Sequence, residues 1–253
     1  MNLYEICFSP TGGTAKVSAA LTEKLSADST RVDLTDAKKD FGDVVLDKED
    51  VALIAVPSYG GRVPGPAARR ISAIRGNGAR AVLVCVYGNR AYEDTLAELQ
   101  DTAEKAGFRV IAAVAGIAEH SIARGYASGR PDADDLRLLA QFAENIKKKI
   151  ESGSTSVPQI PGNRPYKKAG SAELVPKPTK DCISCGRCAA KCPTGAIDPE
   201  DPSKVNKDAC ISCMRCVSIC PHNARKVNAL MLALVNKMLK KPCSVRKECE
   251  LHV

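Results

Sequence analysis

The first 152 residues alternate between short continuous apolar runs and longer segments whose apolar positions recur every three or four residues. The continuous runs predict buried strands, and the longer spacing predicts helices with one apolar face. The predicted strands are Leu3–Phe8, Thr30–Leu34, Val51–Val56, Ala81–Val86 and Phe108–Val114. The predicted helices are Thr14–Ala27, Pro66–Ile74, Tyr92–Ala106 and Asp132–Ile150. Alternating strands and helices predict right-handed βαβ units, hence an α/β domain with a doubly wound parallel sheet between two helical layers.

Residues 153–178 break this alternation, because five prolines lie there among Gly, Ser and Lys. This composition predicts an extended, semi-rigid linker. A cysteine-rich segment over 179–227 follows, and apolar spacing predicts a last helix over Ala224–Lys240. The predicted organisation is therefore an α/β domain over 1–152, a linker over 153–178, a small cysteine domain over 179–227, and a helix with a tail over 228–253.

The cysteine domain contains two copies of the motif C-x2-C-x2-C-x3-C-P. The first copy has Cys182, Cys185, Cys188 and Cys192, and the second has Cys210, Cys213, Cys216 and Cys220. Such motifs bind [4Fe–4S] clusters, and the fourth cysteine of each copy ligates the other cluster. The pattern predicts two clusters, one held by Cys182, Cys185, Cys188 and Cys220, the other by Cys210, Cys213, Cys216 and Cys192. The alternative, structural zinc, needs four ligands per ion and has no use for this repeated motif.

The formal net charge of +8 has to be considered together with these clusters. Two clusters with their thiolates carry about −4 and a bound phosphate about −2, which leaves about +2. The balance thus gives little support to nucleic-acid binding, and the chain has four Phe and no Trp for base stacking. Apolar runs are too short to span a membrane, and the N-terminus shows no signal peptide. We expect a cytoplasmic protein, because thiolate clusters need a reducing compartment.

The segment Ser9-Pro10-Thr11-Gly12-Gly13-Thr14 lies between the first predicted strand and the first predicted helix. A doubly wound sheet binds phosphate at this place, at a helix N-terminus. The segment matches neither G-x4-G-K-[ST] nor G-x-G-x-x-G. It resembles the flavodoxin loop [ST]-x-T-G-x-T, which implies binding of the terminal phosphate of FMN by Ser9, Thr11, Gly12, Gly13 and Thr14. Pro10 departs from the usual glycine and removes one N–H donor. The alternative is a plain helix cap.

The whole chain, from Leu3 to about Lys226, resembles the fused flavodoxin–ferredoxin proteins of the EFR1-type ferredoxin family. The resemblance rests on the phosphate loop, Pro57–Gly61, the cysteine repeat, Ala118–Ile122 and Gly129–Asp132. It implies a flavodoxin-like five-stranded sheet of order 2-1-3-4-5, a small α+β two-cluster ferredoxin domain and a C-terminal helix. It also implies electron transfer between FMN and the clusters.

The same resemblance implies that two further loops hold the flavin ring. The loop after the third strand contains Pro57, Ser58, Tyr59, Gly60 and Gly61. The loop after the fourth strand contains Tyr87, Gly88, Asn89, Arg90 and Tyr92. Tyr59 and Tyr92 would cover the two ring faces, and Gly60-Gly61 would offer a carbonyl to flavin N5. The alternative is that both tyrosines are ordinary surface aromatics.

Several other side chains remain open to more than one interpretation. Glu119 and His120 follow the fifth strand and are candidates for a proton donor, a domain-docking loop or a local cap. Arg130 is a candidate phosphate partner or a surface residue. Cys7 and Cys85 lie in apolar strands as buried thiols, and we interpret Cys243 and Cys249 as free thiols. The last helix either packs on the first domain or meets a membrane or partner.

These features predict an electron carrier that relays low-potential electrons between FMN, two [4Fe–4S] clusters and redox partner proteins of ferredoxin or flavodoxin type. An FMN-dependent reductase of a small molecule and a cluster-only carrier are the alternatives. The sequence does not name the donor, the acceptor or the oligomeric state.

Overall fold

The computed structural model describes residues 1–170 and 174–253 of the chain. The N-terminal part contains β1 (Leu3–Cys7), α1 (Gly13–Leu25), β2 (Thr30–Asp33), β3 (Val51–Pro57), α2 (Gly65–Ala73), β4 (Arg80–Tyr87), α3 (Thr95–Lys105), β5 (Arg109–Ile117) and α4 (Ala133–Glu151). The C-terminal part contains β6 (Lys177–Pro178), α5 (Arg187–Ala190), α6 (Arg215–Ser218), β7 (Arg225–Lys226), α7 (Ala229–Leu239) and β8 (Glu250–His252). All nine predicted strands and helices of the first 152 residues are present, with ends shifted by a few residues.

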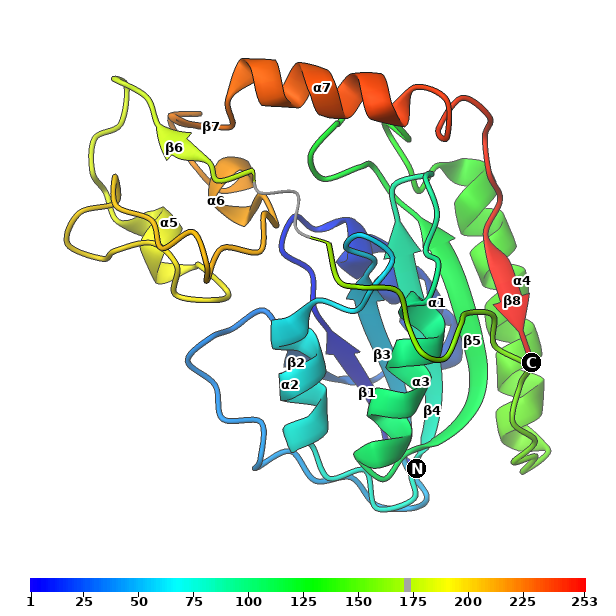
Figure 1. Ribbon diagram of the computed structural model, residues 1–253. Coiled ribbons are helices and arrows are strands. Elements are labelled where there is room, and N and C mark those ends of the chain that lie inside the picture. The colour runs from blue at the N-terminus through cyan, green and yellow to red at the C-terminus, as the bar shows by residue number, and fades with distance from the viewer. Residues whose placement is uncertain (171–173) are drawn as a thin grey trace.

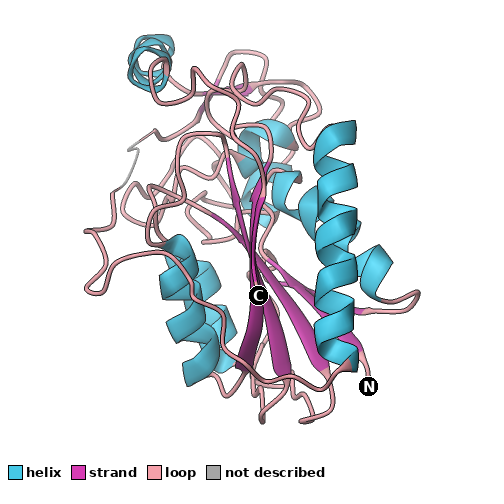
Figure 2. Ribbon diagram, turned by 90° about the vertical axis from the view of Figure 1, so that its right-hand side faces the viewer, coloured by secondary structure: helices cyan, strands magenta, loops and turns pink. Residues whose placement is uncertain are grey.

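The main sheet has the order β2-β1-β3-β4-β5-β8. Strands β1 to β5 run parallel, which confirms the order 2-1-3-4-5 and the doubly wound α/β class. A sixth strand was not predicted: β8, from the end of the chain, pairs antiparallel with β5. Helices α1 and α4 cover one face of the sheet, and α2 and α3 cover the other (Figures 1 and 2). Every residue of β3 is buried, as a sheet covered on both faces requires.

The cysteine domain is small and has little regular structure. Each of its two motif copies contains a four-residue helix, α5 or α6, just before the fourth cysteine, and the short strands β6 and β7 pair antiparallel. The pairing of β6 with β7 joins residues 177 and 178, from the end of the predicted linker, to residues 225 and 226 of the predicted cysteine domain. The domain lies beside the carboxyl-terminal end of the main sheet (Figure 1).

The predicted linker is fixed to the first domain along α3. Its residues Ser171, Ala172 and Glu173 lie outside the described residues. Asp94 and Asp101 lie seven residues apart, and residues two helical turns apart share one face of a helix. The Asp94 carboxylate accepts hydrogen bonds from the backbone N–H groups of Asn163, at 2.8 Å, and Lys167, at 2.7 Å. Asp101 pairs with Arg164 and accepts from the Tyr166 hydroxyl. The segment 163–167 is therefore fastened to the first domain, and it is here called the strap.

Asp94→Asn is expected to loosen this strap. The backbone N–H of Lys167, followed by that of Asn163, lowers the pKa of Asp94 below its usual value near 3.8. A lowered folded-state pKa means that the carboxylate stabilises the fold above about pH 4 and that this contribution is lost as the pH falls through the folded-state pKa. The free energy of unfolding of the variant should be lower by about 1–3 kcal/mol at pH 7, which is the cost of weakening charged hydrogen bonds to a buried group.

Urea unfolding at pH 7 and at about pH 3 checks this expectation. The difference in free energy of unfolding between variant and wild type should be smaller at the lower pH. Asp134→Asn is the matched control, since Asp134 pairs with Arg137 at an exposed position. An Asp94→Asn protein as stable as the control at pH 7 would contradict the proposed role of the strap.

Helix α7 crosses above the first domain and leads the chain back to it (Figure 1). Its carboxyl-terminal half packs through Leu239 and Val235 against Ala123 and Tyr126. Of the two alternatives for this helix, packing on the first domain holds only for this half, because other apolar side chains remain exposed. These are Leu230, Met231, Leu234 and Met238. No helix in the described ranges, 1–170 and 174–253, has the length and hydropathy needed to cross a bilayer.

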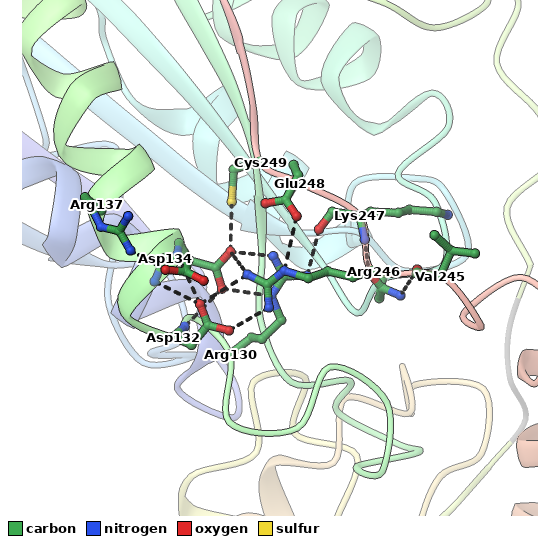
Figure 3. A network of polar contacts seen from close by, with 11 residues as sticks. Arg130, Asp132, Asp134, Arg137, Val245, Arg246, Lys247, Glu248 and Cys249 are labelled. Atoms are coloured by element: carbon green, nitrogen blue, oxygen red, sulfur yellow. Dashed lines mark hydrogen bonds and ion pairs between the residues drawn. The ribbon is translucent and has the colours of Figure 1, made fainter.

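The segment after α7, residues 241–253, is here called the C-terminal tail. The Asn89 side chain donates to the carbonyls of Cys243 and Val245 and accepts from the N–H of Lys247. Arg246 pairs with Asp132 at 2.7 Å, beside the buried pair of Arg130 and Asp135 (Figure 3). Strand β8 then completes the sheet edge. The tail is therefore an integral part of the first domain.

Candidate functional site

The cysteines of the two motif copies surround two separate cavities. Three cysteines of one copy and the fourth cysteine of the other copy line each cavity. The first cavity is lined by Cys182, Cys185, Cys188 and Cys220. The second cavity is lined by Cys192, Cys210, Cys213 and Cys216. The structure therefore brings the cysteines together in the same two groups that the repeat predicts for cluster ligation.

The backbone of both loops takes conformations that turn it around each cavity. Ser184 and Ser212 have φ values of 53° and 51°, and Gly186 and Met214 have values of 69° and 61°. These pairs occupy equivalent positions in the two copies. Left-handed backbone is uncommon outside glycine and is most often maintained at functional sites. The matching geometry shows that the repeat extends from sequence to local structure.

The surroundings of the cavities suit negatively charged metal–thiolate groups. Burial raises the pKa of the Cys213 thiol to about 12 and that of Cys216 to about 11, so thiolates there require a compensating cation such as iron. Arg225 is 3% exposed and lines both cavities. Its Nη1 lies 3.5 Å from the Cys188 sulfur, whereas Nε and Nη2 are buried without a partner in the described residues. The residues present therefore fit two anionic clusters with a cation between them.

Arg225 was missed by the sequence reasoning. It lies five residues beyond the last cysteine, outside the motif, and only the β6–β7 pairing brings it between the two cavities. A buried, charged side chain with unpaired donors is costly unless a negative group compensates it. That cost supports the placement of anionic groups in both cavities.

The phosphate loop, Ser9–Thr14, joins β1 to α1. Gly12 has φ 94° and precedes the helix, so the turn requires a conformation that glycine adopts at little cost. Ser9 Oγ accepts a hydrogen bond from the N–H of Ala15, at 2.9 Å. The N–H groups of Gly12, Gly13 and Thr14 donate to no acceptor among the described residues. A set of free N–H groups at a helix start fits a phosphate group.

The loop after β3 forms a tight turn at the carboxyl-terminal end of that strand. Tyr59 and Arg62 exchange two backbone hydrogen bonds around Gly60 and Gly61, whose φ values of 62° and 84° permit the turn. Ser58 Oγ lies 2.7 Å from Thr95 Oγ1. Burial, followed by the neighbouring Cys213, raises the pKa of Tyr59. The turn therefore holds Tyr59 at the carboxyl-terminal end of β3, and its predicted contact with a flavin ring stays a prediction.

The loop after β4 is largely occupied with the C-terminal tail. Asn89 binds tail backbone, and the carbonyl of Arg90 accepts from the Lys247 ammonium. The Tyr92 hydroxyl donates to Glu250 at 2.6 Å, and its ring meets Tyr87 edge-on at 5.3 Å. The structure gives these side chains a structural role that the sequence reasoning did not foresee. Their predicted part in holding a flavin ring stays a prediction.

The loop after β5 uses Glu119 and His120 for its own shape. His120 Nδ1 accepts from the N–H groups of Ile122 and Ala123, at 3.2 and 3.1 Å. Burial and then Arg90 lower the pKa of His120, so the imidazole is neutral near pH 7. Glu119 pairs with Arg124. This geometry matches the capping interpretation, whereas the proton-donor role stays a prediction.

Of the two alternatives for Arg130, a surface position is wrong, because the residue is 6% exposed and paired with Asp135 inside the first domain. The two strand cysteines, Cys7 and Cys85, are buried and free as expected. The sulfurs of the two tail cysteines contact different groups: that of Cys243 lies 3.8 Å from the Gly88 carbonyl oxygen, and that of Cys249 lies 3.8 Å from Asp135.

In the part of the chain that the structure describes, no three His, Cys, Asp or Glu side chains form a site for a single metal ion.

Comparison with known families supports the assignment of the cysteine domain. Residues 181–225 match the family model of the 4Fe-4S dicluster domain. That segment is therefore a 4Fe-4S dicluster domain, and its two cofactors are [4Fe–4S] clusters. No curated protein matches the chain.

Similar solved structures are flavodoxins and proteins that share their fold. A Streptococcus pneumoniae TIGR4 flavodoxin is 20% identical over 58% of this chain and 99% of its own, with a TM-score of 0.41. A Fusobacterium nucleatum flavodoxin bound to flavin mononucleotide is 15% identical over 59% and 99%, with a TM-score of 0.40. Rubredoxin oxygen:oxidoreductase from Desulfovibrio gigas is 12% identical over 60% and 36%, with a TM-score of 0.43. The strand order β2-β1-β3-β4-β5 carries the fold assignment for this chain.

Proposed function

We propose that this chain is an electron-transfer protein in which FMN binds at the phosphate loop and exchanges electrons with the two [4Fe–4S] clusters. FMN accepts one or two electrons, whereas each cluster transfers one. The observation that carries the proposal is a direct contact between the two sites. Arg215 lines the second cavity, and its Nη1 donates to the carbonyl of Pro10 at 3.2 Å.

The chain's own residues would hold each group in place. The free N–H groups of Gly12, Gly13 and Thr14 would bind the FMN phosphate. The cysteines of the first and second cavities would ligate one cluster each. The strap, helix α7 and the C-terminal tail each contact the first domain and so hold the cysteine domain beside it. Electron transfer between FMN and the clusters would then be an intramolecular step.

The proposal includes the organisation and setting of the chain. Residues 1–152 would hold FMN, 153–178 would link, 179–227 would hold the clusters, and 228–253 would fasten the two domains. This arrangement fits a fused flavodoxin–ferredoxin of the EFR1-type family. The free cysteines require a reducing compartment, so we place the protein in the cytoplasm with ferredoxin- or flavodoxin-type redox proteins as partners.

Anaerobic purification followed by cofactor extraction tests the proposed function. About eight iron atoms, about eight acid-labile sulfides and about one FMN per chain are expected, as two cubane clusters and one flavin require. An absorption spectrum with both flavin bands and a broad iron–sulfur shoulder should accompany them. A chain that takes up iron but no FMN after reconstitution would leave a cluster-only carrier.

A further inference from the structure

The cysteine repeat supplies pairs of residues that are equivalent in sequence but differ in surroundings. Arg187 and Arg215 each precede the third cysteine of their copy, and Ile183 and Ile211 each follow the first. Pro193 and Pro221 each follow the fourth. Identical local sequence would place both members of a pair alike, so a difference between them reports on tertiary contacts.

In every pair, the member beside the second cavity contacts the first domain. Ile211 packs against the main hydrophobic core, whereas Ile183 is 64% exposed. The Pro193 carbonyl accepts from Arg70 at 2.6 Å, whereas Pro221 is exposed. The second cavity is therefore the one fixed to the first domain, and the first cavity faces outward.

The arginine pair shows the sharpest difference. The Arg187 side chain is exposed, and its guanidinium has no hydrogen-bond or ion-pair partner in the described residues. Arg215 Nη1 donates to the carbonyls of Ser9, at 3.5 Å, and Pro10, at 3.2 Å. Arg215 Nε is buried and has no partner in the described part of the chain. One guanidinium thus binds the phosphate-loop backbone through Nη1, while its Nε stays buried without a partner in the described residues.

We propose that Arg215 is the positioning residue that couples the phosphate loop to the cluster of the second cavity. It orders the phosphate loop, supplies positive charge next to a bound phosphate monoester, and makes the second cavity the near cluster site. This inference rests on the proposed function and deepens it. A planar guanidinium suits this task, because it can bind carbonyls and an anion at once.

The coupling has to act in both directions. If Arg215 links phosphate binding to the near cluster, a ligand bound at the phosphate loop alters the surroundings of that cluster. Equally, the cluster alters the affinity of the phosphate loop for the ligand. The exposed Arg187 has no such link. It therefore serves as a control with the same residue type, the same motif position and an equivalent cluster.

The experiment compares full-length, cluster-loaded wild type with Arg215→Met, Arg215→Lys and Arg187→Met. FMN affinity is measured by quenching of flavin fluorescence. Arg215→Met should weaken FMN binding about 10- to 100-fold, the loss expected for one charged hydrogen bond. Arg215→Lys should recover part of this loss, because it restores the charge. Arg187→Met should stay within about twofold of wild type, as expected for an exposed side chain.

A second readout follows the clusters themselves. The electron paramagnetic resonance spectrum of the dithionite-reduced protein should change on addition of FMN in wild type and Arg187→Met, but not in Arg215→Met. Equal effects of the Arg187 and Arg215 substitutions on affinity and spectrum would overturn the assignment. Cluster content is measured in each sample, so that loss of iron is not mistaken for loss of coupling.

A third readout does not require FMN binding. Hydrogen exchange of the phosphate-loop amides in FMN-free, cluster-loaded protein should be faster in Arg215→Met than in Arg187→Met. Unchanged exchange would overturn the positioning role even if FMN binds. If wild type binds no FMN while exchange still responds to Arg215→Met, the proposed function fails but the contact between loop and near cluster stands.

Discussion

Alanine at Cys220 is expected to remove the cluster of the first cavity, although Cys220 belongs to the second motif copy. The structure places Cys220 with Cys182, Cys185 and Cys188 around that cavity. Iron should fall from about eight to about four atoms per chain, because a cubane cluster is not retained when one of its four thiolates is lost. The remaining cluster should be that of Cys210, Cys213, Cys216 and Cys192.

Double variants distinguish crossed from uncrossed ligation. With crossed ligation, Cys185→Ala plus Cys220→Ala remove the same cluster, so the pair should keep about four iron atoms. Cys213→Ala plus Cys220→Ala remove different clusters and should leave about none. Uncrossed ligation predicts the reverse pattern. Cys249→Ala is the control, because Cys249 is buried in the first domain and its loss should leave the iron content unchanged.

Removal of residues 242–253 is expected to be the most destabilising change outside the cysteines. It deletes β8, leaves the buried Asn89 side chain without its three backbone partners, and uncovers the Arg130–Asp135 pair. Each buried polar group left unsatisfied costs about 1–3 kcal/mol, so the free energy of unfolding should fall by more than about 3 kcal/mol. The melting temperature should fall by about 10 °C.

Differential scanning calorimetry of cluster-loaded protein measures this effect. The shortened chain should also associate more readily with concentration, because β5 becomes an unpaired sheet edge. Removal of Val253 alone is the control, since this exposed residue lies outside β8. Equal melting temperatures for the long truncation and the control would show that the tail contributes nothing to stability.

Much of the architecture was predictable from local patterns. Continuous apolar runs gave β1 to β5 and helical spacing gave α1 to α4, because the two side-chain periodicities are properties of short segments. The start of α3 was placed three residues early, at Tyr92, because Glu93 has a left-handed φ of 44° and ends the preceding turn. The grouping of the cysteines around two cavities also followed from the motif, because cluster geometry is contained in the spacing.

The candidate flavin site was predictable only in part. The phosphate loop lies where the sequence placed it, between a strand and a helix, with free N–H groups. The tail contacts of Asn89 and Tyr92 were not foreseeable, because their partners lie more than 150 residues away and carry no distinctive pattern. The strap left a trace in the sequence, acidic residues on one face of α3 and basic residues in the linker, although its pairing needed the fold.

The sequence by itself determined the α/β class and predicted the two cluster sites and the phosphate loop, and the resemblance implied the sheet order. Each of these depends on spacing within about forty residues or on a recognisable motif. The tertiary structure alone decided that β8 completes the sheet, that Arg225 lies between the cavities, and that Arg215 docks while Arg187 faces solvent. Equivalent residues acquire different roles because long-range contacts, and not local sequence, determine which face of a repeat is buried.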